Sequence, residues 1–151
     1  TISVVSAREM FTAVSAISAE QDILILAAAV ADYRPAVYSP EKIKKQEGSN
    51  SLALERTQDI LAWLGAHRTG RQYLCGFAME TENLLANAGA KRSKKNCQMI
   101  VANSLRTPGA GFGTDTNVVT ILTDHGHEAL PQMTKEETAD AILDHILAEM
   151  D

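Results

Sequence analysis

The sequence predicts an α/β fold: a Rossmann-like, open and mostly parallel sheet flanked by helices, with a hairpin region near the C-terminal end. Three observations predict this class. Continuous apolar runs, typical of strands covered on both faces, alternate with segments of helical periodicity. Two of these segments open with a capping box, a Ser or Thr followed three residues later by Glu. The resulting order of strands and helices is that of βαβ units with right-handed crossovers.

The first third of the chain is expected to begin with a short strand at 2–5. Ser6 and Glu9 then form the first capping box, followed by apolar residues at helical spacing. The run ILILAAA at 23–29 predicts a buried strand. The segment 32–40 carries two prolines, which exclude a regular helix or a central strand there.

The middle of the chain continues the alternation of strands and helices. Apolar and polar residues alternate over 51–55, as in a strand. Thr57 is the expected N-cap of a helix that ends near Gly65 or soon after it. A buried strand is expected over 73–79, and a helix beginning at Thr81 follows it.

The last third of the chain predicts two strands, at 98–102 and 118–122, on either side of a glycine-rich loop at 108–113. The sequence DHGH at 124–127 is typical of a hairpin turn. The second capping box, at 134–137, opens a final amphipathic helix. We therefore expect one domain that spans the whole chain, 1–151.

Composition excludes several classes of protein. The 151 residues are 45% hydrophobic, too apolar for a disordered chain, yet no apolar run reaches the roughly 18 residues of a membrane span. The formal net charge of −5 argues against general binding to nucleic acid or to a membrane surface. The two cysteines share no short motif, which predicts neither a disulfide framework nor a zinc site. We expect a cytoplasmic protein.

Half of the positive charge lies in two basic clusters, Lys42, Lys44 and Lys45 in the first and Lys91, Arg92, Lys94 and Lys95 in the second. Ligands of parallel sheets bind beyond the carboxyl ends of the strands. The polar residues expected there are Asp32, Arg34, the segment 77–81 and Asn103. This arrangement predicts an anion site, with Asp32 suited to a ligand hydroxyl, an amine or a divalent cation. The same pattern also fits a buried strand followed by a solvated charge run, and pattern alone leaves both interpretations open.

Several collinear motifs resemble those of the bacterial phosphopantothenate–cysteine ligases, the synthetase half of a bifunctional coenzyme A biosynthesis flavoprotein. The most informative stretch is AAAVADYRP at 27–35, followed by KIKK at 42–45. The resemblance covers essentially the whole chain and continues through TQDIL at 57–61, GFAMET at 76–81, 91–96, VAN at 101–103 and GFG at 111–113.

The resemblance implies a ligase that uses CTP, 4′-phosphopantothenate and cysteine in two steps. The carboxylate of the acid would attack the α-phosphate of CTP, and the amine of cysteine would then displace CMP from the acyl-cytidylate. Mg²⁺ is expected with CTP, whereas FMN is expected only in a separate decarboxylase domain. The resemblance also implies a homodimer in which the phosphopantothenate site is completed across the interface.

The resemblance assigns Lys42 as the catalytic lysine, acting mainly in the conversion of the acyl-cytidylate. It implies a nucleotide-binding set that consists of Ala27, Ala28, Asp32, Lys42, Gln58, Asp59, Ile60, Leu61, Phe77, Lys91 and Lys95. Gln58 stands where relatives often have proline. The i, i+4 spacing of Lys91 and Lys95 puts both ammonium groups on one helical face, which suits a triphosphate. No metal ligand is assigned.

Two alternatives remain. The ligase family begins with a strand and a Gly-rich turn that this sequence lacks, so we expect a ligase domain without them. The chain is then either a ligase or a nucleotide-binding, dimer-forming fragment without activity of its own. The second alternative is a dehydrogenase-like domain, because Tyr38 and Lys42 have the Tyr-x-x-x-Lys spacing. Pro40 between them opposes the helix that this pair requires, and no G-x-G-x-x-G turn accompanies it.

Overall fold

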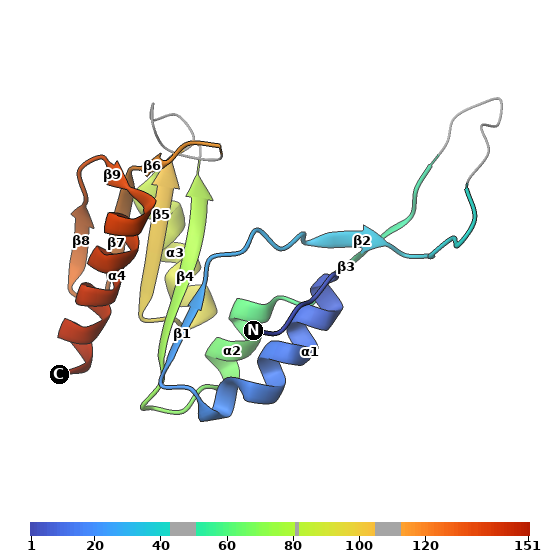
Figure 1. The fold of residues 1–151 in the computed structure, drawn as a ribbon, viewed down its shortest axis with the longest axis horizontal. Coiled ribbons are helices and arrows are strands. Elements are labelled where there is room, and N and C mark those ends of the chain that lie inside the picture. The colour runs from blue at the N-terminus through green and yellow to red at the C-terminus, as the bar shows by residue number, and fades with distance from the viewer. Residues whose placement is uncertain (43–50, 81, 105–112) are drawn as a thin grey trace.

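A computed structural model describes residues 1–42, 51–80, 82–104 and 113–151. Its centre is a five-stranded sheet in the order β1-β4-β5-β7-β8 (Figure 1). The strands are Ile23–Leu26 (β1), Tyr73–Glu80 (β4), Met99–Ser104 (β5), Val119–Thr123 (β7) and Gly126–Ala129 (β8). β1, β4 and β5 are parallel, whereas β7 and β8 form the antiparallel hairpin. The predicted fold class, with its C-terminal hairpin, is confirmed.

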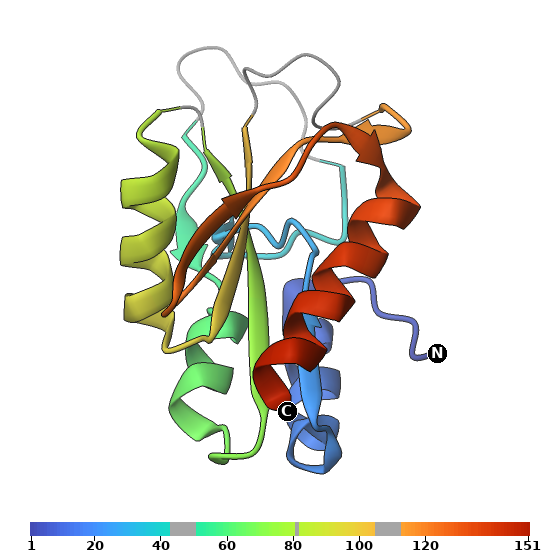
Figure 2. The same ribbon diagram turned by 90° about the vertical axis from the view of Figure 1, so that its left-hand side faces the viewer.

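Helices cover both faces of this sheet (Figure 2). They are Ala7–Ile17 (α1), continued by a 3₁₀ turn at Ser18–Glu20 (η1), Ile60–His67 (α2), Leu84–Lys95 (α3) and Lys135–Met150 (α4). α2 and α3 lie on one face and α4 on the other. α1 packs beside α2, where the rings of Phe11 and Trp63 meet edge to face at 5.4 Å. No helix in the described ranges is long and apolar enough to cross a bilayer.

The side-chain alternation of β4 and β5 divides the core into two halves. Even-numbered residues such as Leu74 and Ile100 pack with α2 and α3, where Leu64 is 1% exposed. Odd-numbered residues such as Cys75 and Val101 pack on the other face, with Ile142 and Ile146 of α4 among them. Both faces of these strands are therefore buried, as their continuous apolar sequences require.

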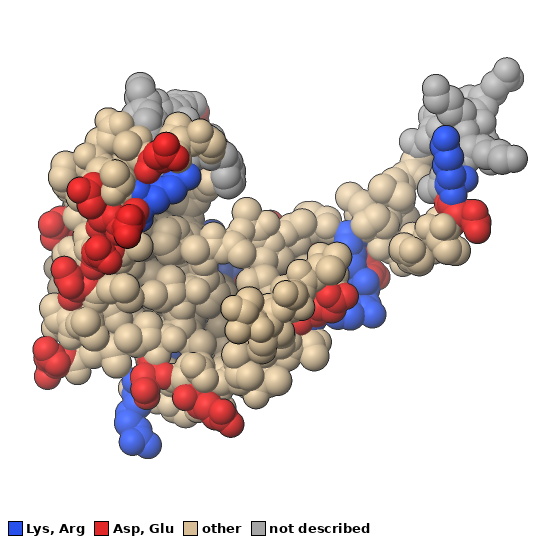
Figure 3. Space-filling model, in the orientation of Figure 1, with Lys and Arg blue, Asp and Glu red and all other residues tan. Residues whose placement is uncertain are grey.

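Two short ribbons complete the described structure. β2 (Tyr33–Pro35) pairs antiparallel with β3 (Leu54–Arg56), and β6 (Thr116–Asn117) with β9 (Met133–Thr134). Residues 33–42 and 51–56, which we call the arm, project from the body of the molecule (Figure 1). The space-filling view shows the same projection, and it shows acidic side chains gathered over α4 (Figure 3). The net charge of −5 is therefore unevenly distributed over the surface.

Two predictions for the first third of the chain are wrong. Residues 2–5 form no strand, because no neighbouring strand pairs with them in the described structure. The Ser6 cap is confirmed by its bond from the Glu9 amide, and the Glu9 carboxylate also accepts from Val5 N–H, at 2.8 Å. The expected strand at 23–29 ends at Leu26 and lies at the sheet edge, which leaves Ile25 40% exposed.

Other element boundaries also differ from prediction. Asp59, not Thr57, caps α2, because the Thr57 hydroxyl donates to the carbonyl of Ala31. The end of α2 at His67, two residues after Gly65, agrees with the prediction. Thr81 and residues 108–112 of the glycine-rich loop lie outside the described residues, so the helix start expected at Thr81 stays a prediction. The hairpin turn at 124–127 and the capping box at 134–137 are confirmed.

Gly65 allows α2 to approach the C-terminal end of α3. A Cβ at this position would lie 1.8 Å from the carbonyl oxygen of Lys95, far inside van der Waals contact. Asn96, which ends α3 with a φ of 50°, donates its amide to the Gly65 carbonyl at 2.7 Å. The distance between the two helices is therefore set by the absence of a side chain at Gly65.

A Gly65→Ala variant is expected to be less stable by about 1–3 kcal/mol, because α2 and α3 must separate to admit the methyl group. Gly89→Ala is the matched control, since Gly89 lies inside α3 and a Cβ there meets nothing within 4 Å. That substitution should stabilise the protein by about 0.4–1 kcal/mol. Urea denaturation measures both changes, and equal effects at the two positions would contradict the close approach.

Candidate functional site

A pocket of about 150 Å³, which we call the α2 pocket, lies where β1 and β4 approach the start of α2. Its wall contains nine of the eleven residues of the predicted nucleotide-binding set: Ala28, Asp32, Gln58, Asp59, Ile60, Leu61, Phe77, Lys91 and Lys95. These residues come from four segments of the chain that the fold brings together. The location at the carboxyl ends of parallel strands agrees with the position at which open α/β sheets bind ligands.

Asp59 links two helices at this pocket. Its Oδ1 caps α2 by accepting from the Ala62 amide at 2.9 Å. Its Oδ2 forms an ion pair with the Nζ of Lys95, which belongs to the last turn of α3. A carboxylate at a helix N-terminus also interacts favourably with the helix dipole. The Lys95 side chain, only 15% exposed, is thereby held at the wall of the pocket.

Lys91 lies one turn before Lys95 on the same face of α3, as their spacing predicts. Its Nζ donates to the carbonyl oxygen of Phe77 at 3.3 Å, so the ammonium sits over the end of β4. Both lysines line the α2 pocket. Two ammonium groups beside one helix N-terminus form a site suited to a phosphorylated ligand.

The chain segment that follows β1 lines the α2 pocket. Thr57 holds it through two bonds, from its hydroxyl to the Ala31 carbonyl and from its amide to the Asp32 carbonyl at 2.9 Å. The Val30 amide bonds to the Ala28 carbonyl at 3.1 Å in a tight turn. The carboxylate of Asp32 is exposed and makes no hydrogen bond or ion pair in the part of the chain that the structure describes.

The structure does not bring Lys42 to this pocket. Lys42 is exposed at the far part of the arm. It lines neither the α2 pocket nor the cavity next to it. Tyr38 lies on the same arm without the helix that a Tyr-x-x-x-Lys pair requires. Arg34, also on the arm, forms an ion pair with Glu55 across the β2–β3 ribbon. Ala27, the other residue of the predicted set that the α2 pocket lacks, lines the neighbouring cavity.

This second cavity, the α4 pocket, has a volume of about 570 Å³ and lies between the strand ends and α4. Five residues line both pockets, namely Ala28, Val30, Asp32, Phe77 and Lys91. Sequence analysis did not predict its Asn117, Lys135 or Thr138, because nothing in the local pattern connects them to the strand ends. Asn103 also lines this pocket, and it lies within β5 and not after it as expected.

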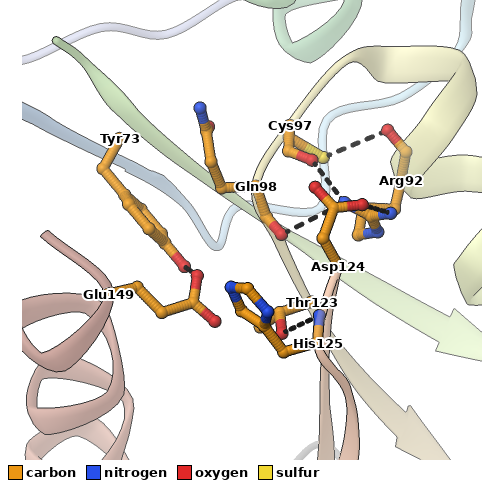
Figure 4. A network of polar contacts seen from close by, with 8 residues as sticks. All are labelled: Tyr73, Arg92, Cys97, Gln98, Thr123, Asp124, His125 and Glu149. Carbon is orange, nitrogen blue, oxygen red and sulfur yellow. Dashed lines mark hydrogen bonds and ion pairs between the residues drawn. The ribbon is translucent and has the colours of Figure 1, made fainter.

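A separate polar network occupies the opposite end of the sheet, where β4 and β5 begin (Figure 4). The Tyr73 hydroxyl donates to Glu149 at 2.6 Å, and burial together with this carboxylate raises the pKa of the phenol. Arg92 forms an ion pair with Asp124 of the hairpin turn, and this bond lowers the pKa of the Asp124 carboxyl. These contacts tie α3, α4 and the hairpin together, which is a structural role.

The two cysteines provide no second reactive centre. Burial raises the pKa of the Cys75 thiol to about 12 and that of Cys97 to about 11, so neither is a thiolate at neutral pH. Cys75 is 0% exposed and acts as a small apolar residue of the core. In the described ranges, no group of three or more His, Cys, Asp or Glu side chains is arranged to hold a metal ion.

The chain is similar to several curated proteins. The coenzyme A biosynthesis bifunctional protein CoaBC of Bacillus subtilis (strain 168) is 45% identical over 148 residues, which are 97% of this chain and 36% of that protein. A cysteine/cysteine sulfinic acid decarboxylase from an unknown prokaryotic organism is 45% identical over 147 residues, 97% of this chain and 41% of that protein. The chain therefore spans about two fifths of the length of these curated relatives.

The crystal structure of the C-terminal domain of a CoaBC protein superposes with a TM-score of 0.79 at 38% identity. The match covers 100% of this chain and 67% of that chain. The family described as DNA/pantothenate metabolism flavoprotein C-terminal domain matches residues 1–150. The chain belongs to this family, the C-terminal domain of the DNA/pantothenate metabolism flavoproteins.

Proposed function

We propose that this chain is the phosphopantothenate–cysteine ligase unit of a coenzyme A biosynthesis protein. The observation that carries the proposal is the α2 pocket, where Lys91, Lys95 and Asp59 converge with the segment that follows β1. The ligase resemblance of the sequence and the family membership both support the same reaction. The names of the relatives describe proteins more than twice as long, so their activities support the proposal only through the part that this chain matches.

The proposed reaction has two steps whose atoms balance. An oxygen of the 4′-phosphopantothenate carboxylate bonds to the α-phosphorus of CTP. The bond between this phosphorus and the oxygen that bridges to the β-phosphate breaks, and pyrophosphate leaves with its electron pair. The amine of cysteine then attacks the acyl carbon, the acyl–oxygen bond to CMP breaks, and the ammonium loses a proton. Activation is necessary because a free carboxylate is a poor acyl donor, whereas CMP is a good leaving group.

The lysines of α3 are suited to the first step. Negative charge moves onto the departing pyrophosphate, and fixed ammonium groups stabilise charge that develops in a water-poor site. Lys91 is held by a neutral carbonyl, so its full positive charge is available to a phosphate. Lys95 shares its charge with Asp59, and a phosphate group would compete for that ion pair. We therefore assign the larger contribution to Lys91.

The residues present fit a magnesium ion that arrives with the nucleotide. Mg²⁺ is usually held by one or two carboxylates together with the phosphates of its substrate. Asp32 would hold it, because its carboxylate lines the pocket and has no other partner among the described residues. Asp59 is less suited, since it already caps α2 and pairs with Lys95. The ion would neutralise the triphosphate.

The arm is proposed to contact a second copy of the chain. Its residues Val37, Tyr38 and Leu52 are 78%, 86% and 63% exposed, an unusual amount of apolar surface for a thin projection. Lys42 lies on this arm, away from the α2 pocket of its own chain. A homodimer in which the second copy covers the arm would bury these side chains. It would also allow Lys42 to lie near a reactive site.

The Lys91→Gln variant is expected to bind CTP roughly tenfold to a hundredfold more weakly, because a hydrogen bond to a charged group is worth about 1.5–3 kcal/mol. Lys94→Gln is the matched control, since Lys94 is an exposed lysine of the same helix outside the pocket. Titration calorimetry measures binding, and CTP-dependent pyrophosphate release with 4′-phosphopantothenate measures the first step. Binding of CTP without release in the unaltered protein would favour a fragment that is inactive alone.

The Lys42→Gln variant should separate the two steps. We expect a burst of pyrophosphate from the first step to persist, while amide formation slows by about a hundredfold or more, as after the loss of one charge-stabilising group. Glu41→Gln, a change at the neighbouring exposed residue, serves as the control. Rapid-quench analysis follows the acyl-cytidylate and the product separately. Normal amide formation in Lys42→Gln would remove the lysine from the mechanism.

The unaltered chain is expected to elute as a dimer, with a mass by light scattering of twice the chain mass. Replacing Val37 and Tyr38 with Asp should raise the dissociation constant at least about tenfold, because each buried apolar side chain contributes about 1.5–3 kcal/mol. Leu147→Asp is the control, since Leu147 is a 53% exposed apolar residue of α4, away from the arm. Equal effects of the two replacements would argue against an interface on the arm.

A further inference from the structure

Thr57 joins two parts of the chain that are 26 residues apart. Its hydroxyl donates to the carbonyl of Ala31, and its backbone amide donates to the carbonyl of Asp32 at 2.9 Å. One residue therefore holds two consecutive carbonyl groups. Thr57 lines the α2 pocket, but both of its hydrogen-bond donors are used inside the protein and neither is left for a ligand. A residue placed in this way affects the site through the residues that it holds.

The two bonds of Thr57 lie at the base of the arm. The chain leaves the body of the molecule after Asp32 and returns to it at Thr57, with the β2–β3 ribbon between them (Figure 1). The Thr57 amide bond comes directly before the Tyr33–Arg56 pair, so it is the first rung of the ribbon. The hydroxyl bond adds a second fixed point, one residue earlier, at Ala31. Two fixed points determine a direction, whereas one leaves rotation about it free.

The ribbon has no core of its own that would fix its direction. All three residues of β3 are exposed. The ion pair of Arg34 with Glu55 joins the two strands to each other and not to the body. The Arg56 guanidinium, 5.7 Å from the centre of the Tyr33 ring, does the same. Because a two-stranded ribbon is at best marginally stable in water, the direction of the arm depends on its base.

Thr57 is itself held close to two helices. Asp59, two residues later, caps α2 by accepting from the Ala62 amide and pairs with Lys95 of α3. The bonds of Thr57 therefore connect the backbone at Asp32 to the start of α2. Asp32, Thr57 and Asp59 all line the α2 pocket. The Asp32 carboxylate is thus placed relative to the lysines of α3 through Thr57.

We propose that Thr57 is a positioning residue of the nucleotide site, which holds the backbone at Ala31 and Asp32 so that the Asp32 carboxylate stays at the α2 pocket and the arm leaves the body in one direction. This inference rests on the proposed function and adds to it a residue that acts through Asp32. Ala31 is exposed, so water can replace the hydroxyl at its carbonyl. Loss of the hydroxyl should therefore affect the order of the site more than the stability of the fold.

The first test measures hydrogen exchange of the full chain by mass spectrometry. In Thr57→Val, which loses the hydroxyl and keeps the amide, the amides of 33–42 and 51–56 should exchange about two- to tenfold faster, the range expected for one hydrogen bond. Thr57→Ser keeps the hydroxyl and should behave as the unaltered chain. Thr12→Val is the matched control, because the Thr12 hydroxyl also donates to a carbonyl, that of Arg8 within α1. Unchanged exchange in the arm, or equal acceleration in β4 and β5, would overturn the proposal.

The second test asks whether Thr57 acts through Asp32. Titration calorimetry with Mg²⁺ and CTP should show binding about two- to tenfold weaker in Thr57→Val and restored in Thr57→Ser. In an Asp32→Asn background the same Thr57→Val change should have almost no further effect, because residues that act as one unit are not additive. Additive losses in the double variant would make Thr57 a structural residue and overturn the proposal. No binding of CTP by the unaltered chain would contradict it too, whereas failure of pyrophosphate release with this coupling intact would refute only the ligase function.

Discussion

The α2 pocket depends on the contact between the C-terminal end of α3 and α2. Because Gly65 has no side chain, the backbones of α2 and α3 lie close together. The Asn96 amide stabilises this contact by donating to the Gly65 carbonyl. One turn and a half before Gly65, the N-cap residue Asp59 reaches Lys95 at the end of α3. The same contact thus sets the helix spacing and the position of one site lysine. A phosphate site at this contact is held in place by the packing of α2 against α3.

Periodicity accounts for most of what the sequence predicted correctly. β4 and β5 contain continuous apolar runs, and strands covered on both faces, here by α2 and α3 on one side and α4 on the other, bury most side chains of such runs. The two capping positions, Ser6 and Thr134, also marked true helix starts, because a capping side chain bonds within its own turn and needs no distant partner. Local interactions are readable from local sequence.

The wrong predictions share the opposite property, since each depended on a distant partner. Thr57 has the residue type of an N-cap, but its hydroxyl bonds to Ala31, 26 residues earlier in the sequence, and Asp59 takes the cap. The segment 2–5 has the composition of a strand and finds no pairing partner in the described structure. For the site, nine predicted residues meet in one pocket, whereas Lys42 lies on an arm whose direction no local pattern specifies.

Two pockets that share a wall would solve a geometric problem that the proposed condensation of an acid and a nucleotide poses. The two anionic reactants repel each other, yet the carboxylate must reach the α-phosphate. In the proposed reaction, cavities on opposite sides of the strand ends would keep the bodies of the reactants apart and let only their reacting ends meet, beside Asp32 and Lys91. The positive charge of Lys91 at that boundary reduces the repulsion at the point of attack.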